Sequence, residues 1–501
     1  MPLLDADAQP DKETASLLSS GGATGGGGSG GGSSGGGGGG ANAVKTSLAL
    51  AAVNFANGVV GAGIVGLPAA MNQAGLPVGI LMCVGVAVVS QYTIRLLAQV
   101  GTAQGTSSYL ELAQRAFGPA GYFLTSLFQT MFAFGAMVTY LIIFKDTMPS
   151  VLGDAGSAAA ARAPAAVLCA TAAFVLVPMC LVRAFGLLAR LGVLKLAATL
   201  LITFTVCFYA VALADAVETT KTVAWRLREV HESYFSALGT ISFAFVCHHQ
   251  TFLVLGSLRN ATPRRFALTT AIAIFGSFAL SLTVAVAGYC TFYDNTRGDI
   301  FINYDAVGAG MPARALITTA KLLLAVNMII TFPGELLVAR ATIESVVERV
   351  RRHRRWLALA APVHDVVLLA RLKAEEEAAA ARSADNWRWG QPLTAPLLEH
   401  VGITLALVAA SVGVAVGVDD IEPILNITGA TAAVFLSFLL PAAIRLRLGA
   451  TATDAVPLLD VRNWAPLAVL VFGTVAFVAS TGEALLNIIY KNGPDGASTD
   501  A

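Results

Sequence analysis

Charged residues are scarce in this chain, and their scarcity excludes most soluble architectures. Asp, Glu, Lys and Arg make up 13% of the 501 residues and hydrophobic residues 56%, whereas about a quarter of the residues in soluble domains are charged. The mean hydropathy is +0.70. We therefore expect an integral, multi-pass membrane protein.

A basic surface and a cysteine framework are also missing. The net charge is +1 and the Lys and Arg residues are scattered between apolar blocks, so we expect no nucleic-acid partner. The cysteines all fall in apolar segments without the spacing of a metal site, and we interpret them as buried free thiols. They lie at positions 83, 169, 180, 207, 247 and 290.

Residues 1–44 contain too few apolar side chains to fold. They end in a glycine and serine tract, which predicts a disordered tail. No cleavable signal peptide is visible, so the first apolar span must direct membrane entry. Within the tail, Glu13, Leu17 and Leu18 fit the acidic dileucine pattern that sorting adaptors read, either as an endolysosomal or vacuolar address or as a chance match.

Eleven apolar runs are long enough to cross a bilayer, which takes about 20 helical residues. If the tail is cytoplasmic, the inner segments hold 23 of the 32 Lys and Arg residues, as the positive-inside rule requires. The C-terminal segment 491–501 then lies outside. The runs begin near Thr46, Pro77, Gly121, Ala165, Gly186, Phe235, Phe266, Ala313, Glu399, Ile421 and Trp464.

The first span carries an unusual cluster of glycines in the stretch VNFANGVVGAGIVGLP, residues 53–68. It fits the dinucleotide fingerprint GxGxxG, but that site needs a preceding strand and an acidic residue about 20 positions later, and neither is present. The glycines could instead serve close packing between helices. Because Gly61, Gly63 and Gly66 point in different helical directions, we favour a break in the helix.

A helix broken inside the bilayer exposes backbone groups that a polar ligand must satisfy. The half-helix starting near Gly63 offers free N–H groups and a positive dipole end, which suit a carboxylate. The carbonyl groups of the half ending near Val60 suit a cation. An amino acid has both charges, and glycines at Gly61 and Gly63 would let it approach the backbone.

Four stretches resemble the amino acid/auxin permease family, and its sodium-coupled neutral amino acid transporter branch in particular. Residues 53–68 are similar to the first helix of that family. The stretch FAFVCHHQTFLVLGSLRNATPRRF (243–266) is similar to the sixth helix and the following loop, TFPGE (331–335) to the end of the eighth helix, and TSSYLELAQRAFGP (106–119) to the loop between helices two and three. The resemblance covers roughly residues 45–490.

The resemblance implies an all-α, LeuT-like fold with two inverted five-helix repeats and one C-terminal helix, eleven transmembrane helices in all. Span six has no glycine or proline pair at its middle, so the sequence alone shows the repeat poorly. The implied divisions are a first repeat 45–212, an outer loop 213–233, a second repeat 234–445 that includes a cytoplasmic loop 340–396, an inner loop 446–463 and an eleventh helix 464–490.

The resemblance also implies a substrate site and an ion site. The N–H groups of Ala62 and Gly63 would bind the substrate carboxylate, and the carbonyl groups of Gly58 and Val59 its ammonium, beside Gly61. Candidates for contact with the substrate side chain are Phe243, Cys247 and His248. A coupling sodium ion would lie against Asn57, Val60, Asn327 and Thr331.

Three titratable residues at membrane depth leave alternatives open. His248 and His249 point about 100° apart on a helix, which disfavours a metal site and leaves a pH sensor or a hydrogen-bonded structural pair. Lys321 could extend to the interface, or act as a gating or ion-substituting cation.

The combined prediction is a secondary active amino acid transporter coupled to Na⁺ or H⁺, working as a monomer in the plasma membrane or a vacuolar or lysosomal membrane. No fixed acid is evident at the site, which favours neutral substrates. The alternative is a nutrient sensor that binds amino acid without moving it. No nucleophile–base pair or metal cluster is evident, so we expect no enzyme and no cofactor beyond the coupling ion.

Overall fold

The computed structural model describes residues 46–154, 163–181, 192–213, 230–307, 314–360, 395–449 and 460–491. Within these ranges the regular structure is helical, apart from one isolated bridge between Thr46 and Leu258. Ten helices there are long and apolar enough to cross a membrane, and a bent pair of shorter helices makes an eleventh span. The prediction of eleven transmembrane helices is confirmed.

The first five spans are α2 (Leu48–Val59) with α3 (Gly63–Ala74), α4 (Leu76–Ala103), α5 (Tyr109–Asp154), α7 (Pro164–Thr171) with η1 (Ala172–Leu176) and α8 (Val177–Leu181), and α10 (Gly192–Ala212). The next five are α12 (Tyr234–Phe245) with η2 (His248–Gln250) and α13 (Thr251–Ser257), α14 (Pro263–Phe292), α16 (Arg314–Ala360), α18 (Ala395–Gly417), and α19 (Glu422–Thr428) with η6 (Gly429–Ala433), η7 (Phe435–Leu439) and α20 (Leu440–Leu448). The last is α21 (Trp464–Lys491), after η8 (Val461–Asn463), and the short η3 (Tyr293–Asn295) and α15 (Ile300–Val307) connect α14 to α16.

Local sequence signals set several helix boundaries. The Ser47 side chain accepts a hydrogen bond from Leu50 N–H at the start of α2, and Thr262 caps α14 in the same way through Arg265 N–H. Proline occupies the first turn of α4 and of α14, where its missing N–H has no helical partner to lose. The long α5 bends at Gly118, whose φ of 67° suits glycine.

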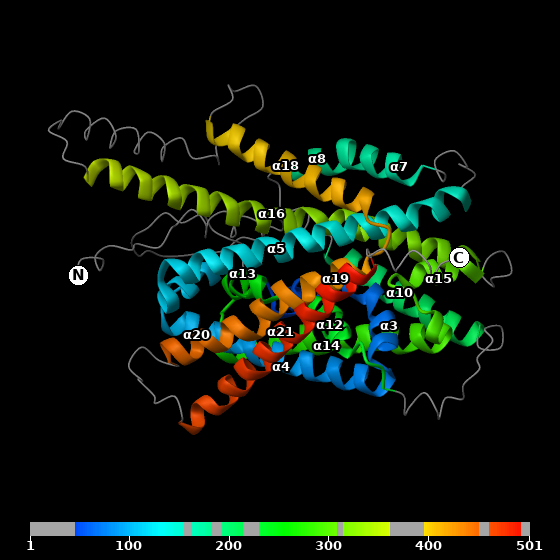
Figure 1. Cartoon of the computed structure of the whole chain (residues 1–501), viewed down its shortest axis with the longest axis horizontal. Coiled ribbons are helices and arrows are strands. Elements are labelled where there is room, and N and C mark those ends of the chain that lie inside the picture. The colour runs from blue at the N-terminus through cyan, green and yellow to red at the C-terminus, as the bar shows by residue number, and fades with distance from the viewer. Residues whose placement is uncertain are drawn as a thin grey trace, which may run out of the picture.

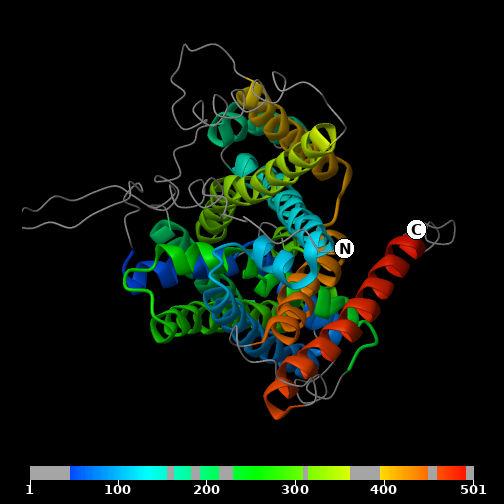
Figure 2. The same ribbon diagram turned by 90° about the vertical axis from the view of Figure 1, so that its left-hand side faces the viewer.

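The broken spans lie at the centre of the bundle. The helix α3 packs against both α12 and α14, while α5 and α16 run alongside each other and form a long layer beside them (Figure 1). Figure 2 shows α21 at the edge of the molecule, away from α16. The two halves of the chain therefore meet where span one and span six are interrupted.

The described part of the fifth span starts at Gly192, and the expected start near Gly186 lies outside the described residues. The helix α16 continues past Arg340 to Ala360, so the first part of the expected 340–396 loop continues the helix of the eighth span. The 1–44 tail with Glu13, Leu17 and Leu18, most of the 213–233 loop, residues 361–394, most of the 446–463 loop and residues 492–501 lie outside the described residues.

Candidate functional site

The first span is interrupted between Val59 and Gly63, and the prediction of a broken helix is confirmed. The two halves, α2 and α3, meet at an angle of 53°. Val60 N–H still bonds to the Ala56 carbonyl at 2.7 Å, but Gly61 N–H turns back to Val59 O at 3.0 Å. No side chain caps α3. Its first N–H groups, which have no intrahelical partner, are therefore directed toward the break.

The sixth span is also interrupted, although its sequence contains no glycine or proline there. The helix α12 ends at Phe245, Val246 is extended with ψ of 123°, and Cys247 has φ of −145° before the short turn η2 begins. The His248 ring lies 2.8 Å from Thr93 Oγ1 of α4, which fixes the chain after the break. The polar run Cys247–Gln250 thus marks a second interruption.

The two interruptions face each other across a small pocket. The first span contributes five backbone positions, α5 and the end of α12 contribute aromatic and apolar side chains, and α16 contributes one acid. The free volume is about 10 Å³, room for one water molecule at most, so an amino acid does not fit into the pocket in this conformation. It is lined by Gly58, Val59, Gly61, Ala62, Gly63, Phe132, Ala136, Tyr140, Phe243, Val246 and Glu335.

The structure gathers most of the predicted substrate residues at this pocket but leaves out Cys247 and His248. The first-span residues and Phe243 line it. Cys247 is fully buried in a hydrophobic cluster, and His248 is turned toward Thr93. The extended residue Val246 rotates the chain after Phe243, so positions 247 and 248 do not continue the helical face of α12.

The first-span glycines serve both close packing and the break. A Cβ on Gly63 would lie 2.5 Å from Ala244 Cα, and one on Gly66 would lie 2.5 Å from Leu425 Cδ1, so these two glycines allow neighbouring helices to approach. A Cβ on Gly61 would instead point to the Tyr140 hydroxyl, 3.3 Å away across the pocket. The two interpretations of the glycine cluster therefore apply to different residues.

The predicted ion ligands fall into two groups. Asn57 is buried, and its Nδ2 donates to the Gly192 carbonyl of α10 at 2.7 Å. Thr331 Oγ1 donates to Asn327 O at 2.7 Å and lies 3.4 Å from Asn327 Oδ1, so these two residues share one face of α16. Val60, at the break itself, is 7% exposed. Among the described residues no group of three His, Cys, Asp or Glu side chains could hold a metal ion.

Glu335 corrects the expectation that the site has no fixed acid. Its side chain is buried and lines the pocket, and its Oε1 lies 3.7 Å from His249 Nε2. Glu335 stands one helical turn after Thr331 within TFPGE, a spacing that places both on one face of α16. The four-residue spacing from Thr331 was the sequence signal that could have placed Glu335 at the site. Whether that face of α16 meets the break in the first span depends on tertiary packing, which the spacing does not show.

Lys321 forms an ion pair within the protein. It is 2% exposed, its Nζ pairs with Asp305 of α15, and it donates to Ser150 Oγ of α5 at 3.3 Å. Nearby, Lys145 binds the Val418 carbonyl. These contacts link α5, α15, α16 and the connection between α18 and α19, and they do not support an ammonium extended to the bilayer interface.

Asp299 lies beside this cluster, between η3 and α15 and outside the membrane spans. It is 1% exposed, Oδ1 accepts from Phe301 N–H at 2.8 Å, and Oδ2 has no hydrogen-bond partner among the described residues. Burial raises the pKa of Asp299 to about 7; Asp146 and Asp305 also raise it, while the Phe301 N–H and Lys321 oppose the shift.

Stability near this end of the bundle should therefore depend on pH through Asp299. Its folded-state pKa exceeds the usual value of 3.8, so the stability that its neutral form contributes is complete below about pH 4 and is lost as the pH rises through about 7. Asp299→Asn keeps the shape without the charge. We expect its thermal unfolding midpoint to exceed that of the wild type near pH 8 and to vary less with pH. Parallel pH profiles of the two proteins would contradict this assignment.

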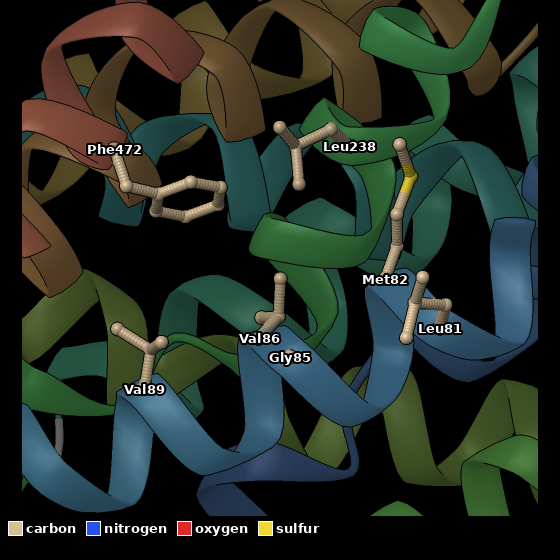
Figure 3. A pocket seen from close by; sticks show the side chains of 7 residues that line it. All are labelled: Leu81, Met82, Gly85, Val86, Val89, Leu238 and Phe472. Atoms are coloured by element: carbon tan, nitrogen blue, oxygen red, sulfur yellow. The ribbon is translucent and has the colours of Figure 1, made fainter.

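A larger cavity, of about 260 Å³, lies elsewhere and has no polar side chain in its lining. Figure 3 shows that its residues come from α4, α12 and α21. Leu81 in its wall is 71% exposed, so this hollow opens on the lipid-facing side of α4. It offers nothing to bind a charged substrate. Its residues are Leu81, Met82, Gly85, Val86, Val89, Leu238 and Phe472.

Comparison with known proteins places this geometry in context. The model of the family described as "Transmembrane amino acid transporter protein" matches residues 44–486. The chain is 30% identical over 406 residues, 80% of this chain and 79% of the relative, to a Danio rerio protein named "Putative sodium-coupled neutral amino acid transporter 11". It is 26% identical to "Vacuolar amino acid transporter 2" of Saccharomyces cerevisiae, over 80% of this chain and 76% of that protein.

Solved structures share the fold at low identity. The Eremococcus coleocola manganese transporter matches with a TM-score of 0.52 and 10% identity, over 99% of this chain and 92% of that one. Mhp1, a nucleobase-cation-symport-1 family transporter in a closed conformation, matches with a TM-score of 0.52 and 12% identity, over 89% and 92%. The predicted LeuT-like arrangement of helices is confirmed by these likenesses.

Proposed function

Because the chain belongs to the transmembrane amino acid transporter family, we propose that it is a secondary active transporter of neutral amino acids, driven by Na⁺ or H⁺. The observation that carries this proposal is the interrupted first span, whose uncapped α3 begins at the pocket wall opposite the second interruption. Alternating access would then move the two repeats around this site.

The break offers complementary groups for a zwitterion. The N–H groups of Ala62 and Gly63, at the positive end of α3, would bind the substrate carboxylate. The carbonyl groups of Gly58 and Val59, at the end of α2, would bind its ammonium. Since these contacts use the backbone alone, they would hold any α-amino acid and leave selection to the side-chain end of the pocket.

The walls of the pocket favour an uncharged side chain. Phe132 and Phe243 stack obliquely with ring centroids 5.4 Å apart, and Ala136 and Val246 complete an apolar surface. Glu335 is the exception, but His249 and Lys195 supply basic groups beside it, so it does not require a cationic substrate. This supports neutral amino acids as the substrate class.

Uptake by the purified chain in proteoliposomes tests the proposal. An amino acid panel would be offered with a sodium gradient or a pH gradient imposed separately. We expect at least one neutral amino acid to accumulate above its equilibrium level. Specific binding without accumulation under either gradient would instead indicate a sensor and would contradict transport.

The sodium version of the proposal makes its own prediction at Asn57. Its side-chain oxygen would coordinate the ion together with Val60, Asn327 and Thr331. Losing one ligand of a charged group should cost about 2 kcal/mol, so Asn57→Ala is expected to raise the half-saturating sodium concentration by roughly 10-fold or more. Asn54→Ala, one turn earlier on α2, is the matched control. An unchanged sodium dependence in Asn57→Ala would remove this residue from the ion site.

We propose the cytoplasm for the N-terminus, because the inner segments then hold most of the Lys and Arg residues. The vacuolar relative and the dileucine pattern at Glu13, Leu17 and Leu18 support a vacuolar or lysosomal membrane, with a sorting adaptor as partner; the plasma membrane is the other candidate. We propose a monomer as the working unit.

A further inference from the structure

Among the described residues, Glu335 is the one acidic side chain that lines the pocket at the break. It is 6% exposed, and its Oε2 has no hydrogen-bond partner among the described residues. A carboxylate at membrane depth is costly unless a proton, a cation or several donors compensate it. Glu335 is therefore a candidate site for a proton or another cation beside the substrate pocket.

Groups that can exchange a proton face Glu335 from three neighbouring elements. His249 Nε2 of η2 lies 3.7 Å from Oε1. Lys195 of α10 and Tyr140 of α5 interact with it electrostatically, and Tyr140 shares the pocket wall.

The other titratable groups near α16 are engaged elsewhere. Arg340 bonds to the Cys180 carbonyl of α8 and to Thr404 of α18. Glu344 faces His400 Nδ1 at 3.3 Å, and Arg351 pairs with Glu399. The segment η1, which also packs against α16, carries no titratable side chain. The surroundings of Glu335 are therefore defined by Tyr140, Lys195 and His249.

The geometry between Glu335 and His249 suits a shared proton. His249 Nε2 lies 3.7 Å from Glu335 Oε1 and 3.2 Å from Gln250 Nε2. In a neutral histidine one ring nitrogen carries the single ring proton and the other presents a lone pair. A proton brought to this pair can therefore reside on the carboxyl group or on the ring, and it removes the cost of a carboxylate buried at membrane depth.

We propose that Glu335 binds the coupling proton of the transport cycle and shares it with His249. The inference rests on the proposed function and deepens it by naming the ion and its carrier. A proton would attract η2 of the interrupted sixth span to α16 and favour the closed pocket. Its release would leave a charged carboxylate at membrane depth, which favours opening of the pocket to water.

A proton fits this position better than the other cations. A hard cation prefers several oxygen ligands, whereas the ion-pair partner of Glu335 is a ring nitrogen. A cationic substrate side chain would meet the basic groups of His249 and Lys195 beside Glu335. A proton needs no additional volume and can move along the hydrogen-bonding groups that are already there.

The test separates driven accumulation from exchange. Purified protein in liposomes would be given a mixture of radiolabelled alanine, serine, glutamine and leucine, first with an inward proton gradient and then in counterflow at equal pH. We expect Glu335→Gln to lower the ratio of gradient-driven accumulation to counterflow by at least about 10-fold relative to the wild type. Glu344→Gln, which alters another Glu–His pair on α16, should keep both activities.

Each outcome has a defined meaning. Undiminished proton-driven accumulation in Glu335→Gln overturns the inference, as does a wild type that responds only to sodium, and both leave the proposed function intact. A wild type that accumulates nothing refutes that function itself.

If folded Glu335→Gln loses both activities, Glu335 binds substrate and the inference is wrong. If the variant does not fold, Glu335→Asp decides: a shifted pH profile of uptake is expected, and an unchanged profile overturns the inference.

Discussion

Replacing Gly61 with valine is expected to reduce amino acid uptake to background while the protein remains folded in the membrane. A Cβ at this position would lie 3.3 Å from the Tyr140 hydroxyl, and the two methyl groups of valine would project into a free volume of only about 10 Å³. They would hold a substrate off the backbone of Ala62 and Gly63. Misplacing a ligand by about 1 Å can cost 100-fold in rate, so we expect at least about a 100-fold loss.

The matched control for this prediction is Gly276→Val. Gly276 lies on the exposed face of α14, and a Cβ there would meet nothing within 4 Å. Uptake by purified, reconstituted protein and the elution profile from size exclusion would be compared for both variants. Normal uptake by Gly61→Val would mean that the substrate does not touch the break.

Gly429→Ala is expected to prevent recovery of folded protein. The added Cβ would lie 1.9 Å from the Gly239 carbonyl oxygen and 2.6 Å from its carbon. Both are backbone atoms of α12, so they cannot rotate away as the end of a side chain could, and α12 would have to separate from η6. Overpacking of this kind costs about 1–3 kcal/mol or more, a large share of the stability of a folded protein.

Expression yield and the thermal unfolding midpoint in detergent would measure this effect. Gly413→Ala on α18 is the control, because a Cβ there meets open space and alanine favours the helix more than glycine does. We expect the control to unfold at the wild-type temperature or slightly above it. A stable Gly429→Ala protein would contradict the close packing of span six against span ten.

The sequence predicted one interruption well and the other only in part. In span one, Gly58, Gly61, Gly63 and Pro68 signal a break through local backbone preferences, and the helix ends where they cluster. In span six, Val246 and Cys247 have no such preference. Their conformation is stabilised by distant contacts, such as that between His248 and Thr93, and a single sequence does not show such contacts.

The missed features of the site depend on tertiary packing. Glu335 stood within a recognised motif, but its orientation toward the break follows from the rotation of α16 against α5 and α10. Lys321 could be recognised as unusual at membrane depth, but its partner Asp305 lies in a separate short helix. Hydropathy and charge counts locate such residues in a span, and they do not tell which groups those residues meet.

The most direct measurement of the central claim is a structure of the purified protein with a bound neutral amino acid. The account predicts that the carboxylate lies about 2.9 Å from the N–H groups of Ala62 and Gly63, with the ammonium near the Gly58 carbonyl. An amino acid bound elsewhere, or a first span that forms one continuous helix through residues 58–66 around the ligand, would contradict the claim that this interruption binds the substrate.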